Sequence, residues 1–364
     1  MSKVLFLVNH DVVIYNFRLE LVERLLADGH SVVISSPYGE RIDDLINLGC
    51  EYKEIKMSRH GTNPFKELGL IFAYRKILKE TQPDIVLAYT IKPNIYGSIA
   101  CRLSKIPCVT NITGLGTAVE NGGIMQKITV MLYKLALGKA RKIFFQNEEN
   151  MRFFADQKIA NQSQYQLIPG SGVNLEHFCP IEYPADKEKV EFAFISRIMQ
   201  EKGIDQYIDA AKIIKKKHPN TVFHVCGFCE QDYEDKLKAL EGDGVITYHG
   251  MVRDVRSMLA HTHCTVHPTY YPEGISNVLL ESSACARPII TTDRSGCREV
   301  IDDGVNGFIV EQKNSSDLIE KIEKFLSLTW EEKRAMGLAG RKKAEKEFDR
   351  QIVVEAYMNI VNEL

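Results

Sequence analysis

Two glutamates, Glu273 and Glu281, stand eight positions apart in the stretch YYPEGISNVLLESS. Pro272 and Gly274 mark a loop around the first glutamate, whereas NVLLESSACA has the composition of a helix that Ser276 can cap. Glu281 is therefore expected about one and a half turns inside this helix. The pair could be a catalytic acid and base, a nucleotide-binding pair, or two ordinary surface carboxylates.

The start of the expected helix suits an anion. Backbone N–H groups from Ile275 to Val278 would lack partners and would lie at the positive end of the helix dipole, where a phosphate binds well. Carboxylates repel phosphate but accept hydrogen bonds from diols, so Glu273 and Glu281 would hold the hydroxyls of a sugar and a ribose. The expected donor contacts here are Glu281, Gly274, Ile275, Ser276, Asn277 and Val278.

Cations for a diphosphate leaving group occur in ISRIMQEKGID, which supplies Arg197 and Lys202 at the end of an expected strand. Gly203 would let the backbone approach the donor closely. Two fixed cations and helix amides can stabilise negative charge that develops as the bond to the sugar breaks. The chain has no D-x-D triplet, so we expect no metal and no cofactor. Taken alone, the two cations would be ordinary surface charge.

Short apolar runs alternate with helical patterns along the whole chain, which has 364 residues. This alternation is typical of βαβ units, and therefore of parallel sheets with helices on both faces. We predict two doubly wound Rossmann-like domains: residues 1–170, a linker at 171–189, and residues 190–347. Residues 348–364 have a helical pattern and are expected to pack back on the first domain. The expected strands are KVLFLV, HSVVIS, DIVLAY, PCVTNI, KIFFQN, EFAFIS, TVFHVC, GVITYH, CTVHP and PIITTD.

The composition, with 45% hydrophobic and 26% charged residues, is that of a globular protein. No apolar run approaches the ~20 residues that span a bilayer. The first apolar run is too short for a signal peptide, and nine scattered cysteines suggest no disulfide framework, so we expect a cytoplasmic protein. Residues 1–180 carry 21 Lys+Arg against 17 Asp+Glu. This small excess of positive charge could attract an anionic lipid or acceptor, or it could be ordinary solvated surface charge.

Three blocks of the second half, SRIMQEKG, YYPEGISNVLLESSACARPIITTD and GCREVIDDGVNGFIV, together resemble retaining glycosyltransferases of family 4, which have the two-domain GT-B fold. Blocks of the first half resemble the members of this family that extend undecaprenyl-diphosphate-linked sugars in bacteria, among them N-acetylgalactosaminyl-, capsule and O-antigen transferases. These blocks are NHDVVIYNFRLELVERL, SRHGTNPFKEL, TIKPNIYGSIACRLSKIPCVTNITGLGTAVENGG and LYKLALGKARKIFFQNEEN.

The resemblance implies that Glu273, Arg197 and Lys202 are catalytic, with Glu273 on the donor sugar, Glu281 on the ribose and the two cations on the diphosphate. It also implies a UDP-sugar donor, and a lipid-linked saccharide as the acceptor on the first domain. The base would be held around Phe228 or from Met251 to Arg253. The first domain departs from the family, because NHDVV replaces a glycine pair and TGLG stands where many members have a histidine. Cleft-facing candidates there are His10, Asn16, Arg18, Thr113 and Gly114.

The segment IMQKITVMLYKLALGKARK, residues 124–142, is apolar around most of its circumference and rich in lysine and arginine. It could lie on an anionic membrane surface at the inner face of the plasma membrane, or it could be a buried helix. Two other functions stay open: a non-hydrolysing UDP-sugar epimerase, which would need no acceptor, and an inactive scaffold that binds sugar nucleotides. We expect no nucleic acid partner. The sequence does not reveal which sugar is transferred.

Overall fold

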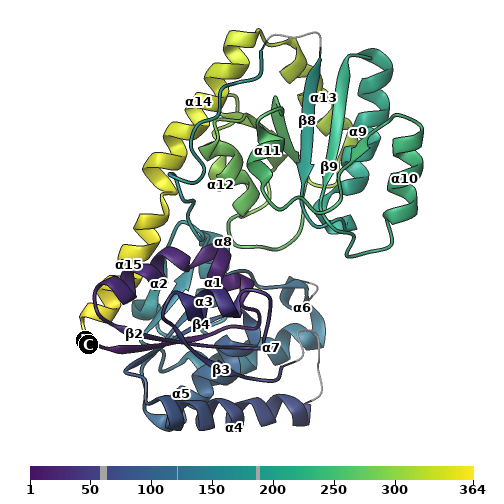
Figure 1. Ribbon diagram of the computed structural model, residues 1–364. Coiled ribbons are helices and arrows are strands. Elements are labelled where there is room, and N and C mark those ends of the chain that lie inside the picture. Colours follow the sequence, from purple (N-terminus) through teal and green to yellow (C-terminus); the bar gives the residue numbers. More distant parts are fainter. Residues whose placement is uncertain (58–63, 121, 186–188) are drawn as a thin grey trace. The chain divides into compact units, whose positions relative to one another are not determined.

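The computed structural model describes residues 1–57, 64–120, 122–185 and 189–364. Residues 58–63 of the motif SRHGTNPFKEL, and residues 186–188 of the expected linker, lie outside the described residues. The chain divides into two compact units (Figure 1). The first unit comprises Met1–Ser171 and Gln351–Leu364, and the second comprises Gly172–Arg350.

The first unit is built on a parallel sheet of seven strands in the order β3-β2-β1-β4-β5-β6-β7. Its central strands are runs of Val, Ile, Leu and Phe that are buried on both faces, as a sheet covered by helices requires. The strands are β1 Lys3–Leu7, β2 Ser31–Ser36, β3 Glu51–Glu54, β4 Ile85–Tyr89, β5 Cys108–Ile112, β6 Lys142–Phe145 and β7 Tyr165–Leu167.

Helices follow most of these strands in the first unit. They are α1 Val12–Phe17, α2 Leu19–Ala27, α3 Ile42–Asn47, α4 Pro64–Thr81, the π-helix η1 Pro93–Gly97, α5 Ser98–Ser104, α6 Thr117–Glu120, α7 Gly123–Leu137, α8 Glu148–Asp156 and η2 Gln162–Gln164. The last helix of the chain, α15 Arg350–Asn362, shares the core of this unit: Val353, Tyr357 and Val361 cluster with Phe6 and Phe144. The side-chain amide of Asn111 also donates to the Tyr357 hydroxyl at 2.8 Å.

The second unit has a parallel sheet of six strands in the order β10-β9-β8-β11-β12-β13. The strands are β8 Val190–Ile195, β9 Thr221–Cys226, β10 Thr247–Tyr248, β11 Cys264–His267, β12 Ile289–Thr292 and β13 Gly307–Val310. The helices are η3 Gln200–Lys202, α9 Ile204–Lys217, α10 Glu234–Gly242, α11 Val255–Leu259, α12 Asn277–Ala284, η4 Arg298–Val300, α13 Ser315–Ser327 and α14 Trp330–Glu347.

All ten expected strands are present, and the prediction of two parallel sheets covered by helices is confirmed. The strands that the sequence analysis missed are short, and all three are edge strands: β3, β7 and β13. The sequence EYKE of β3 has no apolar run, because an edge strand needs little burial, so hydrophobic periodicity gives no signal there.

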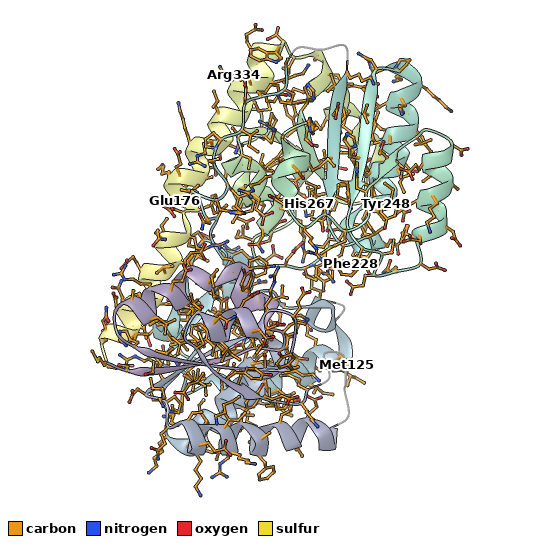
Figure 2. The ribbon with its side chains drawn as sticks, in the orientation of Figure 1. Met125, Glu176, Phe228, Tyr248, His267 and Arg334 are labelled. Atoms are coloured by element: carbon orange, nitrogen blue, oxygen red, sulfur yellow. The ribbon has the colours of Figure 1, made fainter. Side chains whose placement is uncertain are left out.

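The segment 124–142 is not one helix. Helix α7 ends at Leu137, Ala140 is buried, and Lys142 already begins β6. One side of α7 packs into the first unit through residues such as Tyr133 and Leu137, so the helix is partly buried. Its other side exposes large apolar side chains: Ile124, Met125, Ile128, Met131 and Leu135, of which Met125 is labelled in Figure 2. Among the described residues, no helix is long and apolar enough to cross a membrane.

Candidate active site

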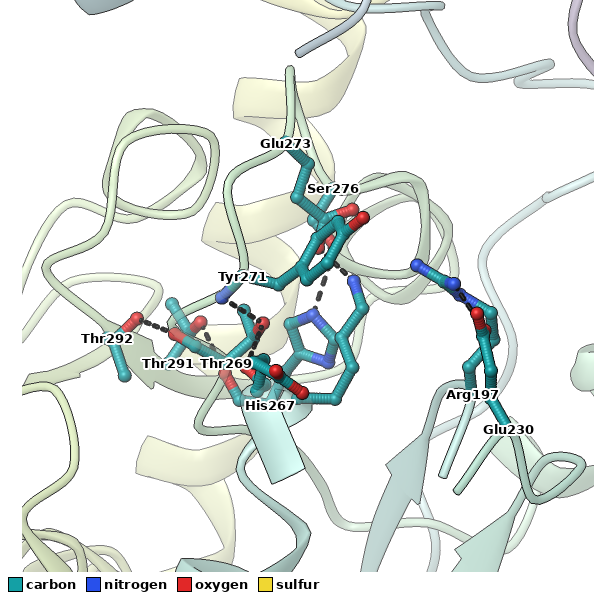
Figure 3. A network of polar contacts seen from close by, with 11 residues as sticks. Arg197, Glu230, His267, Thr269, Tyr271, Glu273, Ser276, Thr291 and Thr292 are labelled. Carbon is teal, nitrogen blue, oxygen red and sulfur yellow. Dashed lines mark hydrogen bonds and ion pairs between the residues drawn. The ribbon is translucent and has the colours of Figure 1, made fainter. Parts of the chain in front are cut away.

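In the second unit, the loops that follow β8, β11 and β12 carry most of the residues singled out in the sequence. The carboxyl ends of parallel strands lie at one edge of a sheet, which is where open α/β sheets bind ligands. Side chains from these loops form one network of polar contacts (Figure 3). The described part of the chain contains no group of three side chains that could hold a metal ion.

Lys202 and Glu273 form an ion pair, although 71 residues separate them in the chain. Lys202 ends the short helix η3 and is only 4% exposed. Gly203 follows with a φ of +81°, and a Cβ there would lie 2.1 Å from the Pro268 carbonyl oxygen. Only glycine therefore lets this turn pack against the end of β11, and that packing brings Lys202 to Glu273.

The charge of Glu273 depends on this pair. Burial by itself would raise the pKa of Glu273, but the Lys202 ammonium, with the Arg197 guanidinium, holds it below its ordinary value. The carboxylate is thus ionised at neutral pH and can accept hydrogen bonds from hydroxyl groups.

Arg197 provides the second cation of the network. Its guanidinium pairs with Glu230 and lies 5.2 Å from the centre of the Tyr271 ring. The Lys202 ammonium lies 5.0 Å from the centre of the same ring. Tyr271 therefore contacts both cations through its electron-rich face, a contribution that no spacing in the sequence indicated.

His267 is a buried member of the network that the sequence analysis did not assign to the site. It ends β11, is 1% exposed, and its Nε2 lies 3.3 Å from the Ser276 hydroxyl (Figures 2 and 3). Burial, helped by the Lys202 charge, lowers the pKa of His267 to about 3, so the imidazole is neutral. A neutral imidazole beside the cations adds no repulsion to an anion that binds there.

The start of α12 differs from expectation in one respect. Ser276 is the N-cap, but its hydroxyl contacts His267 instead of capping the helix, and its N–H donates to the Gly296 carbonyl at 2.8 Å. The expectation that the Ser276 amide is available to a phosphate is therefore wrong. Among the described residues, no hydrogen bond engages the amides of Asn277 and Val278, which stay the donors at this helix start.

Gly296 fixes the loop that carries Glu273. Its φ is +93°, and a Cβ at this position would lie 1.8 Å from the Gly274 carbonyl oxygen. The N–H of Gly296 donates to Glu299 at 2.7 Å, so the loop after β12 is itself held in place. The sequence block GCREV contains Gly296 and Glu299, but only the fold reveals that this loop closely approaches the loop of Glu273.

Glu281 lies on α12 and is partly buried. Burial raises the pKa of Glu281 to about 7, and the positive charge of Arg350 opposes that rise. Glu281 is thus not a solvated surface carboxylate, since such a group would keep an ordinary pKa.

The first-unit candidates do not form a comparable network. His10 is exposed, with Nδ1 2.9 Å from Asp11 Oδ1, and Asn16 is exposed as well. Arg18 is 2% exposed and packs on the rings of Tyr89 and Tyr357, so the prediction that it faces a cleft is wrong. Thr113 and Gly114 are partly buried in the loop after β5.

A strained turn at the end of β4 in the first unit escaped the sequence analysis. Thr90 has a φ of +69°, an unfavourable conformation for a β-branched residue, and the π-helix η1 begins three residues later. The Thr90 hydroxyl and the Asn94 side-chain oxygen are buried without hydrogen-bond partners in the described part of the chain. Strain and π-helical turns of this kind concentrate at functional sites.

Two family models match the chain and together cover most of it. The model "Glycosyl transferases group 1" matches residues 180–343, and "Glycosyl transferase 4-like" matches residues 3–147. The two family models thus identify a glycosyltransferase. The chain belongs to the group 1 glycosyltransferases of family 4, as the resemblance in the sequence predicted.

Curated relatives align along most of the chain. The N,N'-diacetylbacillosaminyl-diphospho-undecaprenol alpha-1,3-N-acetylgalactosaminyltransferase of Campylobacter jejuni is 27% identical over 374 residues, covering 98% of this chain and 97% of that protein. An Escherichia coli protein, UDP-Gal:alpha-D-GlcNAc-diphosphoundecaprenol alpha-1,3-galactosyltransferase, is 24% identical and covers 71% of this chain and 70% of its own length.

Solved structures share the fold. A glycosyltransferase of Rickettsia africae superposes with a TM-score of 0.79 at 19% identity, covering 100% of this chain and 98% of that one. Anabaena Alr3699/HepE in complex with UDP and glucose also gives a TM-score of 0.79, at 16% identity and full coverage of both chains. The GT-B fold is therefore confirmed.

Proposed function

We propose that this glycosyltransferase moves a hexose or N-acetylhexosamine from a UDP-sugar to a polyprenyl-diphosphate-linked saccharide, with retention of the anomeric configuration. One observation carries the proposal: Lys202, Arg197 and Glu273 gather beside the amide donors at the start of α12. Relatives named for transfer to undecaprenyl-diphosphate-linked sugars support the acceptor, and the HepE complex supports UDP as the nucleotide.

The geometry suits stabilisation of a leaving UDP. As the bond from the sugar C1 to the diphosphate oxygen breaks, negative charge grows on the diphosphate, where Lys202, Arg197 and the amides of Asn277 and Val278 would hold it. The acceptor hydroxyl would attack C1 from the face that the diphosphate leaves, and its proton would pass to the departing phosphate oxygen. Glu273 would position sugar hydroxyls, since its lowered pKa makes it a poor proton donor.

Two exposed apolar side chains suit the uracil base. Phe228 follows β9 and is 45% exposed, and Met251 follows β10 and is 67% exposed. Both lie beyond the carboxyl ends of their strands, so they belong to the same edge of the sheet as Arg197. Stacking on a base would remove these apolar surfaces from water.

The acceptor is assigned to the first unit. Thr90, Thr113 and Gly114 follow β4 and β5 at the carboxyl edge of its sheet, and the backbone strain at Thr90 supports this assignment. The exposed apolar side of α7, with Lys127 and Lys134 on the same helix, suits an anionic membrane that carries the lipid-linked acceptor. Flotation with anionic liposomes tests this contact. If the protein does not bind the liposomes, the membrane contact is refuted, whereas the proposal for the donor site is unaffected.

The central experiment incubates the purified chain with UDP-sugars and polyprenyl-diphosphate-linked saccharides. We expect release of UDP that depends on the acceptor, a product with the donor's anomeric configuration by NMR, and undiminished activity in EDTA. Conversion of the UDP-sugar in the absence of acceptor would indicate an epimerase instead. Binding of UDP-sugar with no turnover across the panel would indicate a scaffold.

The site assignment has its own test. Glu273→Gln and Glu281→Gln should each lower transfer at least about tenfold, which corresponds to ~1.4 kcal/mol of transition-state stabilisation. If neither variant does so, the two glutamates do not contact the donor.

A further inference from the structure

The loop after β1 in the first unit encloses a carboxylate. Asp11 is 0% exposed, and the N–H of Arg41, from the loop after β2, donates to its Oδ2 at 2.6 Å. A Cβ at Gly39 would lie 2.2 Å from Asp11 Oδ1, so the second loop can close over the carboxylate only because residue 39 has no side chain. Although Asp11 is the N-cap of α1, its side chain makes no capping hydrogen bond. The fold therefore fixes this carboxylate through contacts other than helix capping.

His10 is the residue that can pair with the other oxygen of this carboxylate. Its Nδ1 lies 2.9 Å from Asp11 Oδ1, and no other described residue gives this buried oxygen a hydrogen bond. The Arg41 side chain pairs with Asp44 instead. Because a buried carboxylate oxygen without a donor is costly, the pairing favours the tautomer of His10 with its proton on Nδ1. The Val12 nitrogen, 3.3 Å from Nδ1, would favour the other tautomer, but an ionised oxygen at 2.9 Å is the stronger partner.

This tautomer leaves Nε2 of His10 as an acceptor at the carboxyl edge of the sheet. The side chain is 50% exposed, and no hydrogen bond from the described part of the chain engages Nε2. Leu7 of β1 aligns with Ala88 of β4, so His10 and Thr90 follow neighbouring strands at the same edge. An exposed neutral acceptor in this position suits a sugar hydroxyl, which can donate a hydrogen bond, and does not suit an ionised phosphate oxygen.

We propose that His10 binds a hydroxyl of the acceptor saccharide through Nε2, and that Asp11 is the positioning residue that holds the ring and keeps the proton on Nδ1. The inference rests on the proposed function, in which the first unit binds the acceptor. It adds the chemistry of one contact: the part of the acceptor that meets His10 is a neutral sugar and not the diphosphate.

Nitrogen NMR of the full chain, with isotope-labelled histidine, tests the tautomer without any substrate. At about pH 8, above the ordinary pKa of histidine, we expect the proton of His10 on Nδ1, and His10→Gln assigns the signal by its loss. In Asp11→Asn, the Arg41 N–H keeps the amide oxygen on its side, so the NH₂ group faces Nδ1 and the proton should move to Nε2. A wild-type proton on Nε2, or the same tautomer in both chains, would overturn the proposal.

Transfer kinetics test the role of the pair. Asp11→Asn should raise the KM for the acceptor about tenfold and leave the KM for the UDP-sugar unchanged, because Nε2 no longer accepts from the hydroxyl. Asp44→Asn is the matched control: it removes the carboxylate that pairs with Arg41 at 3.0 Å, and both KM values should equal those of the wild type. An acceptor KM that is the same in Asp11→Asn as in the wild type refutes the role of Asp11.

A double-mutant cycle with His10→Ala separates positioning from a structural role. His10→Ala removes the contact, so adding Asp11→Asn to it should raise the acceptor KM less than about twofold further. If Asp11 only supports the loop, the rise of about tenfold should recur in both backgrounds, and the proposal is then wrong.

This proposal and the proposed function can fail separately. If the wild-type chain releases no UDP with any lipid-linked saccharide, the proposed function fails, and the contact of His10 with the acceptor fails with it. If the wild-type chain transfers sugar and the cycle shows no coupling between His10 and Asp11, only the role of this pair is wrong.

Discussion

The carboxyl edges of the two sheets hold charged side chains in different ways. In the second unit, Lys202 pairs with Glu273 and Arg197 pairs with Glu230. In the first unit, Arg18 rests on the rings of Tyr89 and Tyr357, and its Nε has no hydrogen-bond partner among the described residues. The charges of the second edge are thus paired, and Lys202 among them is buried. The first edge combines the enclosed Arg18, a Lys92–Glu67 ion pair at 2.6 Å and a strained turn at Thr90.

This difference bears on what each edge can bind. Arg197, Glu230 and Glu273 are partly exposed, so the Arg197–Glu230 pair can exchange a partner for a ligand at small cost. An enclosed guanidinium cannot exchange its partner without opening the core. This difference supports the proposal that the second unit holds the diphosphate and that the first unit recognises neutral acceptor groups near Thr90.

The sharpest way to break the comparison is to remove the buried cation of the second edge. Lys202→Met removes the ammonium that pairs with Glu273 and one of the two cations proposed to hold the leaving diphosphate, so transfer should fall at least about 100-fold in a UDP-release assay. Lys217→Met is the control, since Lys217 pairs with Glu323 at 2.6 Å on helices away from this edge. Equal activity of the two variants would refute the assignment of charge stabilisation to Lys202.

A second prediction tests whether close loop packing sets the site geometry. Gly296→Ala places a methyl group against the Gly274 carbonyl and should displace the Glu273 loop, lowering transfer about 50-fold. Gly304→Ala imposes the same kind of backbone strain at a φ of +77° but meets no atom within 4 Å. It should cost about 1 kcal/mol of stability and leave turnover intact. Comparable turnover in both variants would show that the loop contact is unimportant.

A third prediction concerns the stability of the second unit. Burial raises the pKa of Glu281 from 4.5 to about 7, so the folded chain binds this proton more tightly than the unfolded chain does. Stability attributable to Glu281 therefore falls as the pH rises from 4.5 to 7. Glu281→Gln should be more stable than the wild type by about 2 kcal/mol in urea unfolding at pH 8, and no more stable below pH 4.5. A gain that is independent of pH would contradict this mechanism.

The smallest expected effect lies in the first unit. Thr90→Gly removes the strain of a left-handed β-branched residue and should raise stability by about 1 kcal/mol, while raising the KM for the acceptor and not that for the UDP-sugar. Lys105→Gly is the control, because Lys105 is exposed and also left-handed, with a φ of +59°. It should be stabilised without any change in KM. If Thr90→Gly changes only the donor KM, the acceptor does not bind at this turn.

Local patterns predicted much of the fold and part of the site. Apolar runs and helical periodicity identified ten strands, among them every central strand of both sheets, because burial on both faces leaves a strong signal. They did not identify edge strands such as β3, whose side chains stay half-exposed. They also did not identify the end of α7 at Leu137, although Gly138, a residue type common at helix ends, follows it.

Residue types and spacing indicated the members of the proposed donor site but not their partners. The spacing of Glu273 and Glu281 and the pair Arg197 and Lys202 could be read from the sequence. Spacing did not reveal the contact of Tyr271 with both cations, the buried His267, or the engagement of the Ser276 amide by Gly296. These contacts join segments that the order of strands in the sheet brings together.

The sequence by itself thus determined the class of fold, the family and the chemical groups of the proposed donor site, since these follow from local periodicity and from motifs within single loops. Only the tertiary structure decided how those groups are charged. Glu273 is ionised because a lysine 71 residues away pairs with it, and the pKa of Glu281 is about 7 because α12 is packed on both sides. Burial and distant charges set a pKa, and neither is a property of the sequence near the residue.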